Sequence, residues 1–170
     1  ETHPFLGAGL GVMVNAYAID QDSTFTNDSP TRVIPHAMAE FRWPHSRMDA
    51  SGGYQTLEPI AQIIWSEVDG DPVPNETSQM VDFDEGNLFA LNRFPGSDRY
   101  ERGWRATLGF SWSRFEPSGR EYALTVGRVI RAEDLGQFTK ASGLDGGSSD
   151  WLVSGRLKLD SRLSLANRSL

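Results

Sequence analysis

Residues 103–115 alternate strictly between apolar side chains and polar or small ones, and this pattern limits the folds that the chain can adopt. One parity holds only apolar residues, namely Trp104, Ala106, Leu108, Phe110 and Trp112. The other parity holds Arg105, Thr107, Gly109, Ser111 and Ser113. Because successive side chains of a strand point to opposite faces, the segment is predicted to be a strand with one apolar face and one polar face. The apolar face requires either the interior of a soluble sandwich or the lipid around a membrane barrel.

Other segments show the same period of two, so about seven strands are predicted. They are residues 5–19, 31–43, 54–66, 103–115, 120–131 and 150–159, and a last strand that begins near Arg162. Several run over about 10 to 13 residues, whereas globular strands usually have about five or six and tilted membrane strands need about 9–11. Aromatic residues on the apolar parity lie mostly near strand ends, as in the aromatic girdles of membrane barrels. The residues expected to face lipid are Trp43, Trp65, Trp104, Leu108, Phe110, Trp112, Leu124, Val126 and Trp151.

The connections between strands carry a second signal. In the second half of the chain, the tight turns at residues 116–119 and 160–161 alternate with the long segments 67–102 and 132–149. Outer-membrane barrels have short periplasmic turns and long outer loops, so this alternation favours a barrel. The loops expected in the first half, residues 20–30 and 44–53, are both of middling length and follow the rule less well.

Composition excludes several functions. A net charge of −7 without a long basic run argues against a nucleic-acid-binding surface. No apolar run approaches the roughly 18 residues of a membrane-spanning helix, which a barrel does not need. Without cysteine, the chain has no disulfide and no thiolate metal site. The chain starts at Glu1 and its last ten residues resemble a strand that has barely begun, so we expect an internal segment of a longer protein.

No pattern predicts a catalytic residue, a cofactor-binding residue or a metal ligand. The groups considered are His3, His36 and His45, the glycine-rich residues 7–11, and the acidic Asp82, Asp84 and Glu85. The histidines have no metal-ligand spacing, and the glycines lie inside an alternating strand with no helix after it, unlike a phosphate-binding loop. The acidic residues lack the rest of a calcium-binding loop and are expected to be solvated. We therefore predict no enzyme activity and no cofactor.

Several motifs between residues 50 and 131 occur together in one known family. Leu57-Glu-Pro59 lies in the third predicted strand, and Asn87-Leu-Phe89 and Asn92-Arg-Phe-Pro-Gly-Ser-Asp-Arg99 follow in the long loop. With the alternating strand that comes next, the chain resembles the LptD family of outer-membrane lipopolysaccharide-assembly proteins, also called organic solvent tolerance proteins. The motif residues are Leu57, Glu58 and Pro59 in the strand, and Asn87, Leu88, Phe89, Asn92, Arg93, Phe94, Gly96, Asp98 and Arg99 in the loop.

The resemblance implies both a fold and a role. Members of the family have a periplasmic N-terminal domain followed by a very large antiparallel barrel, with the lipoprotein LptE inside as a plug. Residues 1–170 would then be an all-β, antiparallel up-and-down part of that one barrel domain, with a long loop at about 67–102. The implied partners are lipopolysaccharide, an LptE-like lipoprotein, the periplasmic lipopolysaccharide bridge acting through the N-terminal domain, and the lipids of a Gram-negative outer membrane.

The polar parity would line the wet lumen of such a barrel. The lumen-facing candidates are Glu40, Arg42, Gln62, Arg105, Arg156 and Lys158, which suit either hydrogen bonds to a plug or glycan or a simple solvated wall. Arg93, Asp98 and Arg99 are predicted to form a charge-assisted network that folds the long loop back over the pore. Two alternatives stay open, which are another outer-membrane barrel, such as a porin or receptor, and a soluble β-sandwich that binds carbohydrate.

Overall fold

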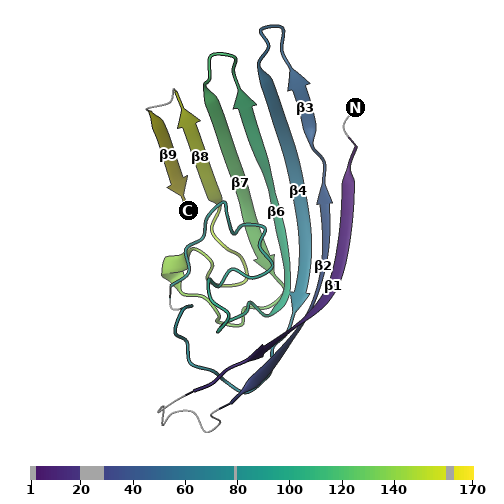
Figure 1. The fold of residues 1–170 in the computed structure, drawn as a ribbon, viewed down its shortest axis with the longest axis vertical. Coiled ribbons are helices and arrows are strands. Elements are labelled where there is room, and N and C mark those ends of the chain that lie inside the picture. The colour runs from purple at the N-terminus through teal and green to yellow at the C-terminus, as the bar shows by residue number, and fades with distance from the viewer. Residues whose placement is uncertain (1–2, 20–28, 79, 160–162) are drawn as a thin grey trace.

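The protein forms one antiparallel sheet with a layer of loops against one of its faces (Figure 1). The computed structural model describes residues 3–19, 29–78, 80–159 and 163–170. The strands are β1 (Phe5–Ala16), β2 (Thr31–Arg42), β3 (His45–Met48), β4 (Tyr54–Ser66), β5 (Asp69–Gly70), β6 (Gly103–Phe115), β7 (Glu121–Arg131), β8 (Leu152–Lys158) and β9 (Ser164–Ser169). Their order is β1-β2-β4-β6-β7-β8-β9, with β3 paired to β4 and β5 paired to β2. This confirms the all-β, up-and-down meander of seven main strands, to which the structure adds two short ones.

Within the described residues the sheet is not closed, since β1 pairs only with β2 and β9 only with β8. Apart from these strands, the described residues contain a single 3₁₀ turn, η1 (Lys140–Ser142). None of the described residues belongs to a helix that is long and apolar enough to cross a membrane.

The strand register places the apolar parity of every main strand on the same side of the sheet. Leu108 of β6, for example, lies between Ala61 of β4 and Arg128 of β7 in the pairing. We call this side the outer face, and the side that carries the loops the inner face. Large apolar side chains on the outer face are exposed, with 89% for Leu10, 53% for Trp104 and 48% for Leu108.

Residues 45–48 of the segment 44–53 form a strand, so the loop predicted over the whole segment is wrong in its extent. β3 continues the register in which β2 pairs with β4, from His45 opposite Leu57 onward. The ladder is interrupted where Trp43 lies opposite Pro59, because Trp43 N donates to Pro59 O at 3.1 Å but Pro59 has no N–H to donate in return, and the register does not change. The true turn spans only residues 49–53 and is closed by a hydrogen bond of 2.8 Å from Asp49 N to Gly53 O.

Short and long connections therefore alternate throughout the described chain. The turns after β3 and β6 lie at one end of the sheet, and the long connections, including residues 67–102 and 132–151, lie toward the other (Figure 1). The turn predicted at residues 160–161 and most of the loop predicted at residues 20–30 lie outside the described residues. The tight β6–β7 turn at residues 116–119 is present, with Glu116 N donating to Arg120 O at 2.9 Å.

Candidate functional site

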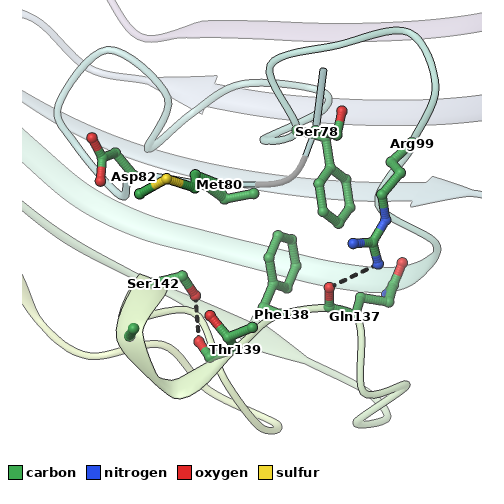
Figure 2. A pocket seen from close by; sticks show the side chains of 11 residues that line it. Ser78, Met80, Asp82, Arg99, Gln137, Phe138, Thr139 and Ser142 are labelled. Carbon is green, nitrogen blue, oxygen red and sulfur yellow. Dashed lines mark hydrogen bonds between the residues drawn. The ribbon is translucent and has the colours of Figure 1, made fainter. Parts of the chain in front are cut away.

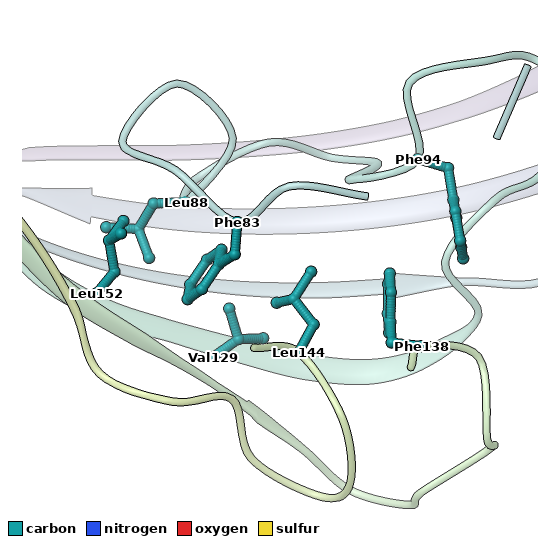
Figure 3. Close-up of a cluster of buried hydrophobic side chains, with 7 residues drawn as sticks. All are labelled: Phe83, Leu88, Phe94, Val129, Phe138, Leu144 and Leu152. Atoms are coloured by element: carbon teal, nitrogen blue, oxygen red, sulfur yellow. The ribbon is translucent and has the colours of Figure 1, made fainter. Parts of the chain in front are cut away.

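Two long loops, residues 67–102 and 132–151, fold inward onto the inner face, and we call them together the loop layer. The loop layer has its own hydrophobic core, shown in Figure 3, which consists of Phe83, Leu88, Phe94, Val129, Phe138, Leu144 and Leu152. Five of these seven side chains come from the loops, and β7 and β8 supply only Val129 and Leu152. The loops are therefore packed against the sheet through buried apolar surface.

The Asn-Leu-Phe motif is seated in a hollow that two facing glycines leave in the sheet. Gly109 of β6 pairs with Gly127 of β7 on the inner face. A Cβ atom on Gly127 would lie 2.5 Å from Cδ2 of Leu88, and one on Gly109 would lie 3.2 Å from Cζ of Phe89. Beside them, Gln62 donates from its Nε2 to the carbonyl oxygen of Phe89 at 3.1 Å. The loop approaches this closely because the two glycines carry no side chain.

Gly127→Val is expected to lift the first loop from the sheet, because the new side chain occupies the space of Leu88. Forcing extra methyl groups into a packed site costs about 1–3 kcal/mol. In the full-length parent protein, limited proteolysis should then cut residues 67–102 faster than in the wild type. Gly155→Val on β8 is the matched control, since a Cβ there meets nothing within 4 Å. Equal cleavage of the two variants would contradict the packing described here.

Glu101, at the end of the first loop, is the centre of a buried ion cluster. Its side chain is fully buried, and its carboxylate oxygens lie 2.6 Å from Nη1 of Arg93, 2.8 Å from Nη2 of Arg131 and 3.5 Å from Nε of Arg105. Burial on its own raises the pKa of Glu101, but the three guanidinium groups together lower it below its ordinary value. One ionised carboxylate thus joins the loop to both β6 and β7.

Carbonyl oxygens of the loop layer supply further acceptors for these arginines. Three cations around one anion leave excess positive charge, and buried donors need acceptors to compensate for lost water. The acceptors are the carbonyl oxygens of Leu88 for Arg93, of Leu91 for Arg105 and of Leu144 for Arg131. The arginines therefore fix the backbone of both loops.

Asp98 fixes a second part of the first loop by accepting hydrogen bonds from backbone N–H groups. Its Oδ2 accepts hydrogen bonds of 2.7 Å from the N–H groups of Glu76 and Thr77, and its other oxygen accepts one from the hydroxyl of Ser78. Burial raises the pKa of Asp98, but the hydrogen bonds from Ser78 and from the backbone lower it well below its usual range. A Cβ on Gly96 would collide with Oγ1 of Thr77, so this turn requires glycine.

The depressed pKa of Asp98 predicts that acid loosens the first loop. Because the folded state favours the ionised carboxylate, this contribution to stability is complete above the unfolded pKa of about 3.9 and is lost as the pH falls toward the lower folded pKa. Protease protection of residues 67–102 in the full-length parent should decline below about pH 4, and Asp98→Asn should remove part of this decline. The exposed Asp82→Asn is the control, and an unchanged pH profile in Asp98→Asn would refute the prediction.

An aromatic stack joins the two loops. The rings of Phe94 and Phe138 lie parallel, with centroids 4.7 Å apart and an angle of 10° between their planes. Guanidinium groups cover both ends, with Cζ of Arg99 4.5 Å from the centre of Phe94 and Cζ of Arg131 4.7 Å from that of Phe138. Cation–π contacts of this kind are favourable, most of all when water is excluded. Beside the stack is a cavity of about 160 Å³, where Arg99 donates to the carbonyl oxygen of Gln137 at 3.1 Å (Figure 2).

The far side of the first loop is bound to β1 and β2. The hydroxyl of Tyr17, just after β1, donates to the carbonyl oxygen of Ser97, as does Nδ2 of Asn15 at 3.3 Å. Arg32 of β2 donates from Nη1 to the carbonyl oxygen of Asp98 at 2.6 Å. With β5 paired to β2, the loop crosses the inner face from β1 to β7.

The motif residues predicted from the sequence all lie in the loop layer or in β4, but they do not act as expected in one respect. Arg93, Asp98 and Arg99 make three separate contacts instead of a single charged network. Arg93 pairs with Glu101, Asp98 accepts from backbone N–H groups, and Arg99 lies over a ring. Asn92 bridges the loop by accepting from Glu101 N at 3.0 Å and donating to Arg99 O at 3.0 Å. In β4, Leu57 is on the outer face and Glu58 on the inner face, while Pro59 accepts a hydrogen bond from Trp43 N.

The remaining candidates divide between the two faces. The register places all six lumen-facing candidates on the inner face. These residues are Glu40, Arg42, Gln62, Arg105, Arg156 and Lys158. The loop layer covers Gln62 and Arg105, whereas the other four remain accessible. Seven of the residues expected to face lipid lie on the outer face. They are Trp65, Trp104, Leu108, Phe110, Trp112, Leu124 and Val126. Trp43 and Trp151 lie just outside β2 and β8 and are exposed.

Sequence reasoning missed the central carboxylate and the contacts of the second loop, which was predicted only as a long connection. Arg131 carries a usable signal, because it lies on the polar parity at the end of β7. Glu101 lies outside any alternating segment, and residues 132–149 match no motif. The roles of Glu101 and of residues 132–149 become apparent only in the folded structure.

Comparison with known proteins agrees with the motifs. A family model described as LPS transport system D, LptD, matches residues 3–169. An LPS-assembly protein LptD of Nitrosospira multiformis is 29% identical over 132 residues, which cover 74% of this chain and 14% of the relative. One of Shewanella frigidimarina is 31% identical over 163 residues, which cover 84% of this chain and 21% of the relative. The match thus spans about a fifth or less of each relative, and the chain belongs to the LptD family.

Proposed function

We propose that the chain is an internal segment of an outer-membrane barrel that delivers lipopolysaccharide to the outer leaflet in a Gram-negative bacterium. The observation that carries the proposal is the loop layer, which contains the family motif and is folded over the inner face of an open, outwardly apolar sheet. In this arrangement the short turns lie in the periplasm and the loop layer lies at the extracellular end, where it narrows the lumen. Residues 1–170 would belong to a single barrel domain.

The accessible half of the inner face suits a polar partner. Between the loop layer and the short turns it presents charged side chains such as Glu40, Arg42 and Lys158. An LptE-like lipoprotein plug would contact this wall, and lipopolysaccharide would reach the lumen from a periplasmic bridge through an N-terminal domain. The outer face would contact membrane lipids. Delivery of lipopolysaccharide in this way needs no covalent chemistry and no cofactor in the barrel. The energy for transport must therefore be supplied by another part of the transport system.

The alternatives explain fewer of the observations. In the described part of the chain no second sheet covers the outer face, as the core of a soluble sandwich would require. A strand such as β1, with Leu6 78% and Leu10 89% exposed, would be costly in water but not in lipid. A porin would need an open pore, which the loop layer obstructs.

Depletion of the full-length parent protein in its own host tests the function. Newly made lipopolysaccharide should then fail to reach the cell surface and should accumulate further inside the envelope. Re-expression of the wild-type parent should restore delivery, and assembly of an unrelated outer-membrane barrel, followed in parallel, controls for a general envelope defect. Unchanged surface delivery after depletion would overturn the proposal.

A further inference from the structure

A second cavity, of about 310 Å³, lies at the loop end of the sheet, where β5, β2 and both loops meet. Its wall includes the arginines Arg32, Arg99 and Arg102, together with Tyr100 and Asp71. Three positive charges thus converge in a chain whose net charge is −7. Of the three arginines only Arg99 belongs to the family motif, so the motif does not account for this clustering.

Two of these arginines are held in place while most of their donors remain uncommitted. Arg32 donates from Nη1 to the carbonyl oxygen of Asp98 at 2.6 Å, and its Nε is buried without an acceptor among the described residues. Arg99 donates from Nη2 to the carbonyl oxygen of Gln137 at 3.1 Å and is fixed over the ring of Phe94. Because an arginine has five N–H donors, each group keeps several for a ligand.

The third arginine is positioned through its backbone. The side-chain amide of Gln137 accepts from the N–H of Arg102 at 2.7 Å and donates to its carbonyl oxygen at 3.1 Å, while the guanidinium is exposed. In the part of the chain that the structure describes, no ion pair joins Arg32, Arg99 or Arg102 to a carboxylate. Arg93 and Arg131, by contrast, both pair with the carboxylate of Glu101, so this cluster is different in kind.

We propose that this cavity binds a phosphate monoester group. Such a group carries a charge of about −1.5 to −2 at neutral pH and has three strong acceptor oxygens, which match three guanidinium groups that donate in forks. A volume near the lower end of ligand pockets, about 300 Å³, is large enough for a phosphorylated sugar headgroup, and the charged wall disfavours acyl chains. The carboxylate of Asp71 in the wall weakens the attraction and keeps the binding reversible. Identification of the natural source as the headgroup of a phosphorylated glycolipid rests on the proposed function, whereas free phosphate offers the same chemistry.

Calorimetric titration of the detergent-solubilised full-length parent with inorganic phosphate, at constant ionic strength, tests the site. Loss of one charged hydrogen-bond donor should weaken binding about tenfold in Arg102→Gln, and more in the double variant with Arg32→Gln. Asp71→Asn should tighten binding. Arg47→Gln on β3, at the opposite end of the sheet, should bind as the wild type does. Because Arg102 is exposed, its variant remains informative if Arg32→Gln disturbs folding.

A second titration separates the two sources of phosphate. Mixed micelles that contain a phosphorylated disaccharide lipid, or the same lipid after chemical removal of its phosphates, replace the free anion. Arginine-dependent binding of the phosphorylated lipid supports the headgroup as ligand, and arginine-dependent binding of inorganic phosphate alone supports a site for the free anion. The proposal is overturned if neither probe binds, or if both bind equally to wild type and Arg102→Gln. These results do not depend on whether depletion of the parent stops lipopolysaccharide delivery.

Discussion

Glu101→Gln in the full-length parent is expected to release the loop layer from the sheet. The substitution leaves Arg93, Arg105 and Arg131 buried without a counter-charge, and removal of one partner from a buried ion pair costs about 3–5 kcal/mol. Both loops should become sensitive to added protease in intact cells. If the loops close the extracellular end, large antibiotics should also enter these cells more readily.

Glu121→Gln is the matched control for this effect. Glu121 pairs with Lys158 on the inner face near the short turns, and both side chains are 41% exposed. Exposed pairs contribute only about 0.2–1 kcal/mol, so this variant should behave as the wild type. If the loops of Glu101→Gln are as well protected from protease as those of Glu121→Gln, the buried cluster does not hold the loop layer.

Leu108→Arg is expected to impair membrane assembly of the parent protein. Leu108 lies at the middle of β6 on the outer face and is 48% exposed. A charged arginine at the middle of the bilayer costs about 2–4 kcal/mol in a barrel. Less folded, heat-modifiable protein should therefore be recovered from the outer-membrane fraction.

Ser113→Arg places the same side chain on the same strand but on the inner face. A lumen position tolerates charge, so normal assembly is expected for this variant. If both variants assemble equally well, the outer face does not contact lipid. A water-soluble but unfolded Leu108→Arg protein would instead favour the sandwich.

The strands could be predicted from the sequence because alternation is a local signal. In β6 every side chain of one parity is apolar. The register then follows, because neighbouring strands pair so that their apolar side chains lie on the same face of the sheet. The error at residues 44–53 arose because the predicted strand ended at Trp43 and all residues from Pro44 to Gly53 were assigned to a loop. Pro59 removes one donor from the ladder opposite Trp43, and the strand resumes at His45 in the same register.

The contacts of the loop layer could not be predicted, because they depend on residues far apart in the chain. Arg131 reaches Glu101 across 30 positions, and Gln137 reaches Arg102 across 35. No periodicity relates such pairs. The motif indicated that residues 87–99 fold in a specific way, but the partners of Arg93 and Asp98 emerge only from the three-dimensional arrangement.

The loop layer also sets where this wall of the barrel is stiff. It acts as a brace that is fastened to β1, β2, β4, β6 and β7, so these strands cannot splay apart at the loop end without breaking buried contacts. β9 is fastened more weakly, through its ladder with β8 and one partly exposed ion pair of 3.7 Å between Nη1 of Arg168 and Oδ2 of Asp84 in the first loop. Any widening that lets a bulky cargo pass should therefore take place beyond the braced strands, which would move as one rigid panel.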